Sequence, residues 1–440
     1  IWFIVDFTSV VRVFVIDWTV IGLSPPTLTL PTLITLVFLS WNCNKDPVSV
    51  ELDDSNLILD TLTLSKISAF NYLIPPNIGS SDRLYIGAKS GFNVPYSLIE
   101  IDSLGQFTSN TGIKWGAFLD SSITLNRVDS IHFKLFSDDS SLDNNSNLKL
   151  YLNCNLSFSE DSSTYLNMNE DLVSEDWTLL GSPHFKSNND TSGNYLTTEL
   201  IWDLTSFDSL LIWDNIDTLV KKKSRVFAIS SDNDTSFFEF LSRESSTGST
   251  DPKINVYYRQ NIILEEDSTY SDTSLSATFY ADGDVSIIDP TSFIQENSFS
   301  DSSIICINNG SGAQSILQFN FDSETLPSNA IIRNAVLKLP LDSIRSDSGY
   351  QIIFNPVSKQ FSPLDSDPYL GLGAPYRVSS KTDGTSIFQI SLKSFLQDVT
   401  YDKQSNMGFK MISSISNNPF KQIFFDLNDL EKKPKIEVTF

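Results

Sequence analysis

Short segments in which apolar and polar residues alternate follow one another along the chain from Leu52 onward. They are rich in Phe, Tyr, Ile and Val, and clusters of Gly, Asn, Asp and Ser separate them, as in SDRLYIGAK, SIHFKLFS and RVFAISS. Alternation with period two places successive side chains on opposite faces of a strand, and the separating residues favour turns. The pattern predicts an all-β fold of antiparallel strands, with two weakly helical segments at 206–216 and 391–399.

The second half of the chain repeats the order of segments found in the first half. SSIICINNG corresponds to DRLYIGAKS, GFKMISS to RVFAISS, and PKIEVTF, at the end of the sequence, to PKINVYY. Short alternating strands repeated in this way are typical of β-sandwiches and jelly rolls. We therefore expect two tandem antiparallel, jelly-roll-like β-sandwich domains at 52–258 and 268–440, joined by a linker at 259–267.

The first 42 residues differ from everything that follows. They end in TLTLPTLITLVFLSW, an uncharged apolar run that is too short for a transmembrane helix and suits the core of a signal peptide. We expect an apolar leader at 1–42, a short polar linker at 43–51, and a secreted or cell-surface protein. Cys43 stands where bacterial lipoproteins carry their lipid, so lipidation at Cys43 and anchoring to the bacterial outer membrane is one interpretation. An incidental cysteine is the other.

The formal net charge is −24, and the acidic residues are spread along the chain. Such a chain repels phosphates and anionic lipids, so we expect no nucleic-acid partner and no membrane contact beyond the leader or a lipid. The acidic residues either form a solvated surface or hold calcium, which takes oxygen ligands. The candidate calcium ligands are Asp232 and Asp234 in SSDNDTS, and Asp282 and Asp284 in YADGDVS.

A set of residues in the first copy resembles the motifs of one known family. The matching residues are Asn77, Gly79, Leu84, Ile86 and Gly87 early on, Asp203, Leu204 and Thr205 later, and Phe240, Ser242, Arg243, Glu244 and Pro252 at the close. The first copy is similar to a DNRLRE-type domain, a surface β-sandwich related to carbohydrate-binding modules. The second copy, without the glycines and the Arg-Glu pair, resembles it more faintly. The resemblance implies a binding or adhesive module rather than an enzyme.

Exposed aromatic rings are the usual stacking platforms for sugars, and Trp115 and Trp177 are the candidates because loop residues flank them. Both could equally be core residues. Arg243 and Glu244 are either a sugar-contacting pair or a structural ion pair at a strand end. We expect a monomeric, non-catalytic protein that binds a glycan or another cell-surface polymer. The alternative is a structural or adhesion protein with no small-ligand site.

Overall fold

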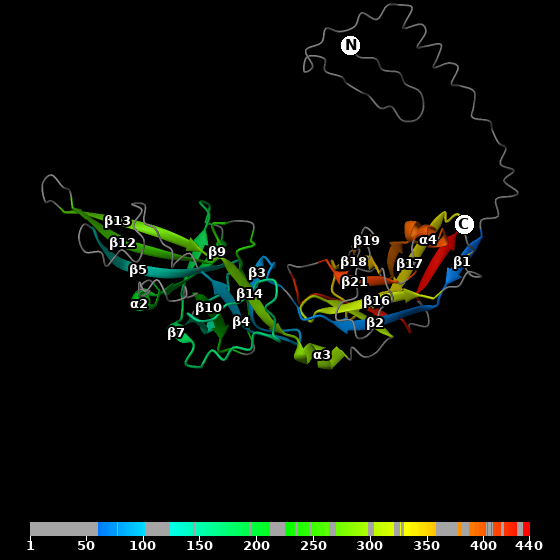
Figure 1. Ribbon diagram of the computed structural model, residues 1–440, viewed down its shortest axis with the longest axis horizontal. Coiled ribbons are helices and arrows are strands. Elements are labelled where there is room, and N and C mark those ends of the chain that lie inside the picture. The colour runs from blue at the N-terminus through cyan, green and yellow to red at the C-terminus, as the bar shows by residue number, and fades with distance from the viewer. Residues whose placement is uncertain are drawn as a thin grey trace, which may run out of the picture. The chain divides into compact units, whose positions relative to one another are not determined.

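The structure is a computed structural model, in which the all-β prediction is confirmed (Figure 1). Residues 61–440 form one compact unit, and every strand pairing described in it is antiparallel. The structure describes residues 60–76, 78–101, 124–143, 146–193, 195–211, 225–233, 236–245, 248–263, 270–297, 303–320, 326, 330–357, 376–379, 387–401, 403, 406, 408–414, 418–428 and 434–440.

Two sheets enclose a first hydrophobic core. The seven-stranded sheet has the order β11-β3-β4-β10-β6-β7, with β14 also paired to β4. Its strands are β3 (Arg83–Lys89), β4 (Phe92–Glu100), β6 (Leu148–Asn153), β7 (Thr178–Gly181), β10 (Val226–Ser231), β11 (Phe237–Leu241) and β14 (Gly283–Asp289). The five-stranded sheet has the order β13-β12-β5-β9-β8. Its strands are β5 (Thr124–Ser137), β8 (His184–Asn189), β9 (Tyr195–Asp203), β12 (Lys253–Ile263) and β13 (Tyr270–Tyr280).

Two further sheets enclose a second core, drawn mainly from the later part of the chain. The four-stranded sheet has the order β1-β23-β17-β20. Its strands are β1 (Thr61–Leu64), β17 (Asn334–Pro340), β20 (Ile387–Ser391) and β23 (Lys435–Thr439). The second seven-stranded sheet has the order β19-β18-β21-β16-β15-β22, with β2 also paired to β16. Its strands are β2 (Ile67–Leu73), β15 (Ile304–Asn308), β16 (Ala313–Phe319), β18 (Gln351–Pro356), β19 (Tyr376–Ser379), β21 (Phe409–Ser413) and β22 (Gln422–Asp426).

The cores form because alternate residues of each strand point inward. Along β12, for example, Ile254, Val256 and Tyr258 are buried, while the residues between them face the other way. Trp202 on β9 packs edge to face against Phe133 on β5, with ring centroids 5.7 Å apart. Burial of side chains of this size supplies most of the stability of a sandwich-type fold.

The first strands of the unit pair with the last. Thr61 of β1 pairs with Thr439 of β23, and β2 runs along the whole of β16. The corresponding places around the first core are taken by β13 and β14, which pair with β12 and β4. In Figure 1 the blue strands β1 and β2 accordingly lie beside yellow and red strands. β1 and β2 thus pair with strands from later in the chain, and β13 and β14 pair with strands from earlier in it; we call these four the exchanged strands.

This pairing does not follow the domain boundaries expected from the repeat. Residues 259–263, within the expected linker, belong to β12, because β12 and β13 continue as one long antiparallel pair up to Ile263 and Tyr270. The strands 61–73 lie with the C-terminal half, and the strands 270–289 lie with the first half. Local alternation specifies a strand but says nothing about its partner.

Four short helical segments complete the described elements. They are η6 (Thr205–Phe207), α2 (Asp208–Leu211), α3 (Thr291–Asn297) and α4 (Lys393–Thr400). η6 with α2 overlaps the expected helical segment 206–216, and α4 overlaps the expected segment 391–399. Asp203 accepts a hydrogen bond from the Thr205 amide at 3.0 Å, and Asp289 accepts one from the Thr291 amide at 2.9 Å. Such bonds satisfy amides that a helix start leaves open.

Candidate functional site

The two sheets around the first core differ in what covers their outer faces. On the seven-stranded sheet, Tyr96, Tyr151 and Val226 form an apolar cluster, and side chains from the segment 154–177 pack onto it. Tyr96 donates a hydrogen bond to the Met168 carbonyl at 3.1 Å, which ties this segment to the sheet. On the five-stranded sheet, the outer face carries polar and aromatic side chains, several of them exposed.

The register of the five-stranded sheet arranges these outward side chains in rows. Lys253 on β12 is paired on one side with Tyr280 on β13 and on the other with Lys134 on β5. In the next row Asn255 is paired with His132, and His132 with Asp203 on β9. These residues come from strands whose alternate positions fill the core, so they share the opposite face.

Exposed aromatic rings stand at two places on this outer face, one on the inner strand β12 and one on the edge strand β13. Tyr257 is 36% exposed and Tyr280 is 46% exposed. The His132 ring lies beside that of Tyr257, with centroids 5.5 Å apart and an interplanar angle of 59°. The Lys253 ammonium lies 5.6 Å from the centroid of the Tyr280 ring. The face therefore combines exposed ring surfaces with amine, amide, imidazole and carboxylate groups, the combination that recognises polyhydroxylated ligands.

The charged groups on this face are partly balanced. Lys134 lies 2.7 Å from Glu199, and the exposed Lys186 lies 3.5 Å from the same carboxylate. Burial alone would raise the pKa of Glu199, but its hydrogen bond and charge interaction with Lys134 leave the pKa lowered. Burial, followed by the charge of Lys134, lowers the pKa of Lys253. The pKa of His132 is also lowered, chiefly by burial, so its neutral form is favoured.

Arg243 and Glu244 lie elsewhere, at the end of β11, in a cluster of charged groups. The Arg243 guanidinium lies 3.1 Å from Glu244 and 3.6 Å from Glu160. Asp284 on β14 accepts a hydrogen bond from the Arg243 amide at 2.8 Å, and its own amide donates to Glu160 at 2.7 Å. Burial raises the pKa of Asp284 well above its usual value and, with the charge of Glu160, raises the pKa of Glu244. Arg243 and Glu244 thus contact each other and their neighbours in the cluster, as expected of a structural ion pair.

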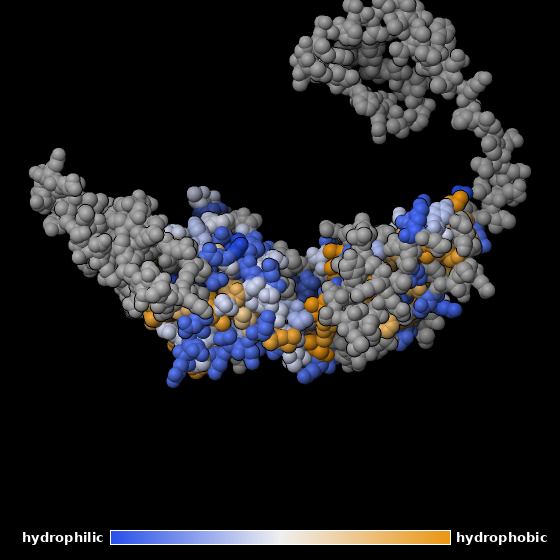
Figure 2. Space-filling model, in the orientation of Figure 1, coloured by the Kyte–Doolittle hydropathy of each residue, from blue (hydrophilic) through white to orange (hydrophobic). Residues whose placement is uncertain are grey.

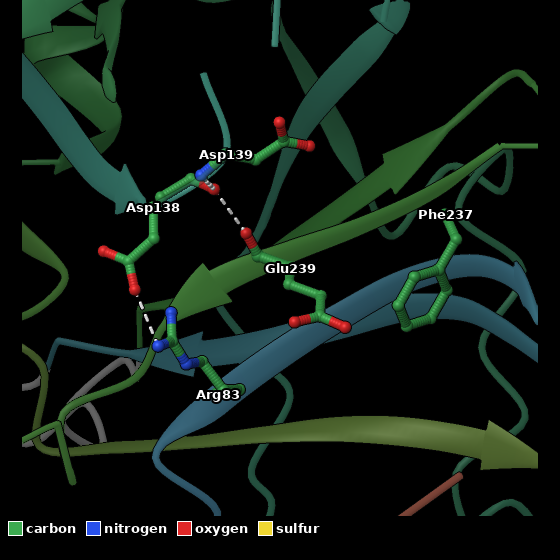
Figure 3. A pocket seen from close by; sticks show the side chains of 6 residues that line it. Arg83, Asp138, Asp139, Phe237 and Glu239 are labelled. Atoms are coloured by element: carbon green, nitrogen blue, oxygen red, sulfur yellow. Dashed lines mark hydrogen bonds and ion pairs between the residues drawn. The ribbon is translucent and has the colours of Figure 1, made fainter. Parts of the chain in front are cut away.

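A polar pocket of about 360 Å³ opens beside β3 and β11. Figure 3 shows Arg83 directed toward Asp138, at 2.6 Å, with Phe237 and Glu239 on the neighbouring strand. Glu239 in turn pairs with Lys89 at 3.1 Å. Asp139, which also lines the pocket, accepts hydrogen bonds from the amide and hydroxyl of Ser141. Each charged side chain that lines this pocket thus already has a partner.

The residues proposed from the sequence are scattered in the structure. Trp177 is 6% exposed, packs in the apolar cluster on the seven-stranded sheet, and donates a hydrogen bond from Nε1 to Glu170 at 3.2 Å. Its ring has no open face for stacking, because the segment 154–177 packs over that cluster. Trp115, Asp234 and Cys43 lie outside the described residues.

The candidate calcium ligands also separate. Asp232 forms an ion pair with Lys149, whose pKa is raised by its hydrogen bond to that carboxylate. Asp282 is exposed, whereas Asp284, two residues further along the chain, is buried in the cluster with Arg243. The structure therefore brings together Arg243, Glu244 and Asp284, which the sequence motifs gave separate roles.

The sequence analysis did not identify several residues of the sheet face and of the charged cluster as candidates. The alternation in KINVYY does place Lys253, Asn255 and Tyr257 on one face, but it does not show that this face is the open one. Glu160 gave no signal, since it lies in a segment without regular strand or helix. The C-terminal repeat has Thr439 where the first copy has Tyr257, so the aromatic platform is not repeated.

Comparisons with known proteins leave the chain without an assigned relative. No family model matches it. No curated protein matches it. One solved structure, described as BspA_C_WT, matches with 9% sequence identity over 81% of this chain and 90% of that chain. Its TM-score of 0.15 is too low for an argument about fold or function. In the described part of the chain, no helix is long and apolar enough to cross a membrane.

Proposed function

We propose that the chain is a non-catalytic glycan-binding protein, and that it binds through the outer face of the sheet β13-β12-β5-β9-β8. The observation that carries this proposal is the presence of two exposed tyrosine rings, Tyr257 and Tyr280, on a face that also presents His132, Asn255 and Lys253. Aromatic rings stack on the apolar faces of sugars, while the amide and charged groups bond to hydroxyls.

The geometry of a sheet supports an extended ligand over a small one. Side chains on one face of a strand repeat about every 7 Å, and neighbouring strands lie about 4.8 Å apart. A polymer with a short repeat can contact several rows of such a surface at once. Figure 2 shows hydrophilic residues over much of the visible surface of the described chain, with smaller apolar areas between them. Given a net charge of −24, a neutral glycan is a better fit than a polyanion.

The proposed setting is extracellular. It rests on the leader-like sequence at 1–42 and on the DNRLRE-type motifs, which include Arg243 and Glu244. A lipid on Cys43 would hold the protein at the bacterial surface, where polymeric glycans are available as ligands. In this setting calcium is a candidate structural ion rather than a catalytic one.

The test is a glycan-array screen of the full chain alongside the double variant Tyr257→Ala/Tyr280→Ala. We expect binding to one class of glycan, reduced about tenfold or more in the double variant, since each lost stacking contact costs about 1 kcal/mol. Tyr401→Ala is the matched control, because Tyr401 is a similarly exposed tyrosine that directly follows α4 and is not part of the five-stranded sheet. Binding that the double variant retains in full would refute the assignment of this face.

A structural or adhesion role is the second candidate, and the exchanged strands favour it. We interpret the two pairs of sheets as the two expected copies, so that each copy completes a sheet of the other through β1, β2, β13 and β14. Such an exchange makes the halves depend on one another, a useful property in a surface spacer. An array without any binding, from a protein shown to be folded, would favour this role.

A further inference from the structure

Three carboxylates from distant parts of the sequence meet at one end of the first pair of sheets. Glu160 comes from the irregular segment between β6 and β7, Glu244 follows β11, and Asp284 is the second residue of β14. One oxygen atom of each lies within 4.8 Å of the other two. Distances of this size allow a single ion to be bound by all three after small side-chain adjustments.

Asp284 supplies an independent reason to expect a ligand at this position. Its side chain is 1% exposed, and its Oδ1 is buried without any hydrogen-bond partner among the described residues. Its other oxygen, Oδ2, accepts a hydrogen bond from the Arg243 amide. Buried carboxylate oxygens are normally paired, because leaving one unpaired costs free energy. A buried carboxylate that has one unpaired oxygen and belongs to a group of three carboxylates is a place for a positively charged ligand.

The charges of the cluster point the same way. Three carboxylates face a single guanidinium, that of Arg243, whose Nε lies 3.1 Å from Glu244 and whose Nη1 lies 3.6 Å from Glu160. The cluster therefore keeps an excess of two negative charges when all three acids are ionised. A divalent cation balances this excess, and carboxylate oxygens are the ligands that calcium prefers.

We infer that Glu160, Glu244 and Asp284 bind a divalent cation of the calcium type. The ion joins the irregular segment 154–177, the end of β11 and the strand β14. Because β14 is one of the exchanged strands, the ion fixes an exchanged strand to the sheet it enters. The site is separate from the proposed glycan-binding face, so each proposal stands or fails without the other.

The test is calcium titration of the full chain after removal of metals by a chelator, followed by calorimetry and by thermal unfolding. We expect saturable binding of one calcium ion per chain and a higher unfolding temperature with calcium than with chelator. Glu160→Gln, on a partly exposed segment, is the main variant and is expected to weaken calcium binding about tenfold or more. Asp284→Asn is expected to weaken it at least as much.

Two control variants separate this site from general binding of calcium to an acidic surface. Asp282→Asn changes an exposed residue that is two positions from Asp284 in the sequence. Asp232→Asn removes the carboxylate that is paired with Lys149. Both are expected to bind calcium as the unaltered chain does. The inference is overturned if the chelated protein takes up no calcium, if Glu160→Gln and Asp284→Asn bind it with unchanged affinity, or if Asp282→Asn alone abolishes binding.

Discussion

The imidazole of His132 on β5 and the phenol of Tyr257 on β12 lie on neighbouring strands, with ring centroids 5.5 Å apart. His132 also faces Asp203 on β9 and is close enough to Lys134 and Glu199 to interact with their charges. Burial is the largest influence and lowers the pKa of His132. This pair links the aromatic part of the proposed binding face to a histidine whose neutral form is favoured by burial.

We expect this histidine to make the folded state less stable in mild acid. The pKa of His132 is lower in the folded state than in the unfolded chain, so the unfolded chain binds the proton more readily. The contribution of His132 to the free energy of unfolding is therefore complete above the usual histidine pKa of 6.5. It is lost as the pH falls through the lowered pKa of the folded state. Urea unfolding between pH 7.5 and 5 measures this. The difference in the free energy of unfolding between the unaltered chain and His132→Gln separates the effect of His132 from that of the many acidic residues. A difference that stays the same from pH 7.5 to pH 5 would contradict this prediction.

Trp177 is expected to stabilise the fold rather than to bind a ligand. Trp177→Ala removes a ring that is 6% exposed and should lower the free energy of unfolding by about 3–5 kcal/mol. Trp177→Phe keeps most of the packing but loses the hydrogen bond to Glu170, so a loss of about 1 kcal/mol is expected. Denaturant unfolding of both variants provides the measurement, with glycan binding of the folded Phe variant as control. Loss of glycan binding by a stably folded Trp177→Phe variant would contradict this prediction and indicate that Trp177 contacts the ligand.

The strand exchange can be tested with a charge on β2. Ala69 is 2% exposed and packs in the second core, so Ala69→Glu should cost about 3–5 kcal/mol. Hydrogen exchange should then show lost protection first in β15–β23, which lie more than 200 residues away in the sequence, and later in β3–β11. Ser65→Glu, at an exposed position between β1 and β2, is the control. Loss of protection that begins in β3–β11 would contradict the pairing.

Gly312 is expected to tolerate no side chain. Its φ is +68°, and a Cβ there would collide with the carbonyl oxygen of Ile74, which is the residue that follows β2. Gly181 has a φ of +112° with open space around it. Gly181→Ala therefore measures the conformational cost alone, about 1 kcal/mol, and Gly312→Ala adds the collision. Thermal unfolding should place Gly312→Ala well below Gly181→Ala; equal values would mean that the chain near Ile74 can move aside.

Local sequence was sufficient for the strands and insufficient for their partners. The alternation around Ile254 and Val256 marks both a strand and its buried face, and the structure bears out both. The pairing of Thr61 with Thr439 joins residues at opposite ends of the described chain, and no local pattern encodes such a contact. The repeat suggested domains at 52–258 and 268–440, whereas β1 and β2 pair with strands from later in the chain, and β13 and β14 pair with strands from earlier in it.

The same reason explains what was missed in the candidate sites. Trp177 follows Glu175 and Asp176, which read as loop residues, but tertiary packing of the segment 154–177 buries the ring. Glu160 joins Asp284 only because that segment folds over the sheet edge at β14. Asp284 was a candidate ligand from its acidic surroundings, yet its relevant neighbours are distant in the sequence rather than adjacent.

The pairing of β1 with β23 also governs how the unit responds to mechanical tension. Thr61 and Thr439 are directly paired in an antiparallel ladder, so the chain enters and leaves the unit at the same end of that ladder. A force that separates Thr61 from Thr439 would load the hydrogen bonds of this ladder one at a time instead of all together in shear. Under such a force the unit would therefore begin to open at the pairing of β1 with β23.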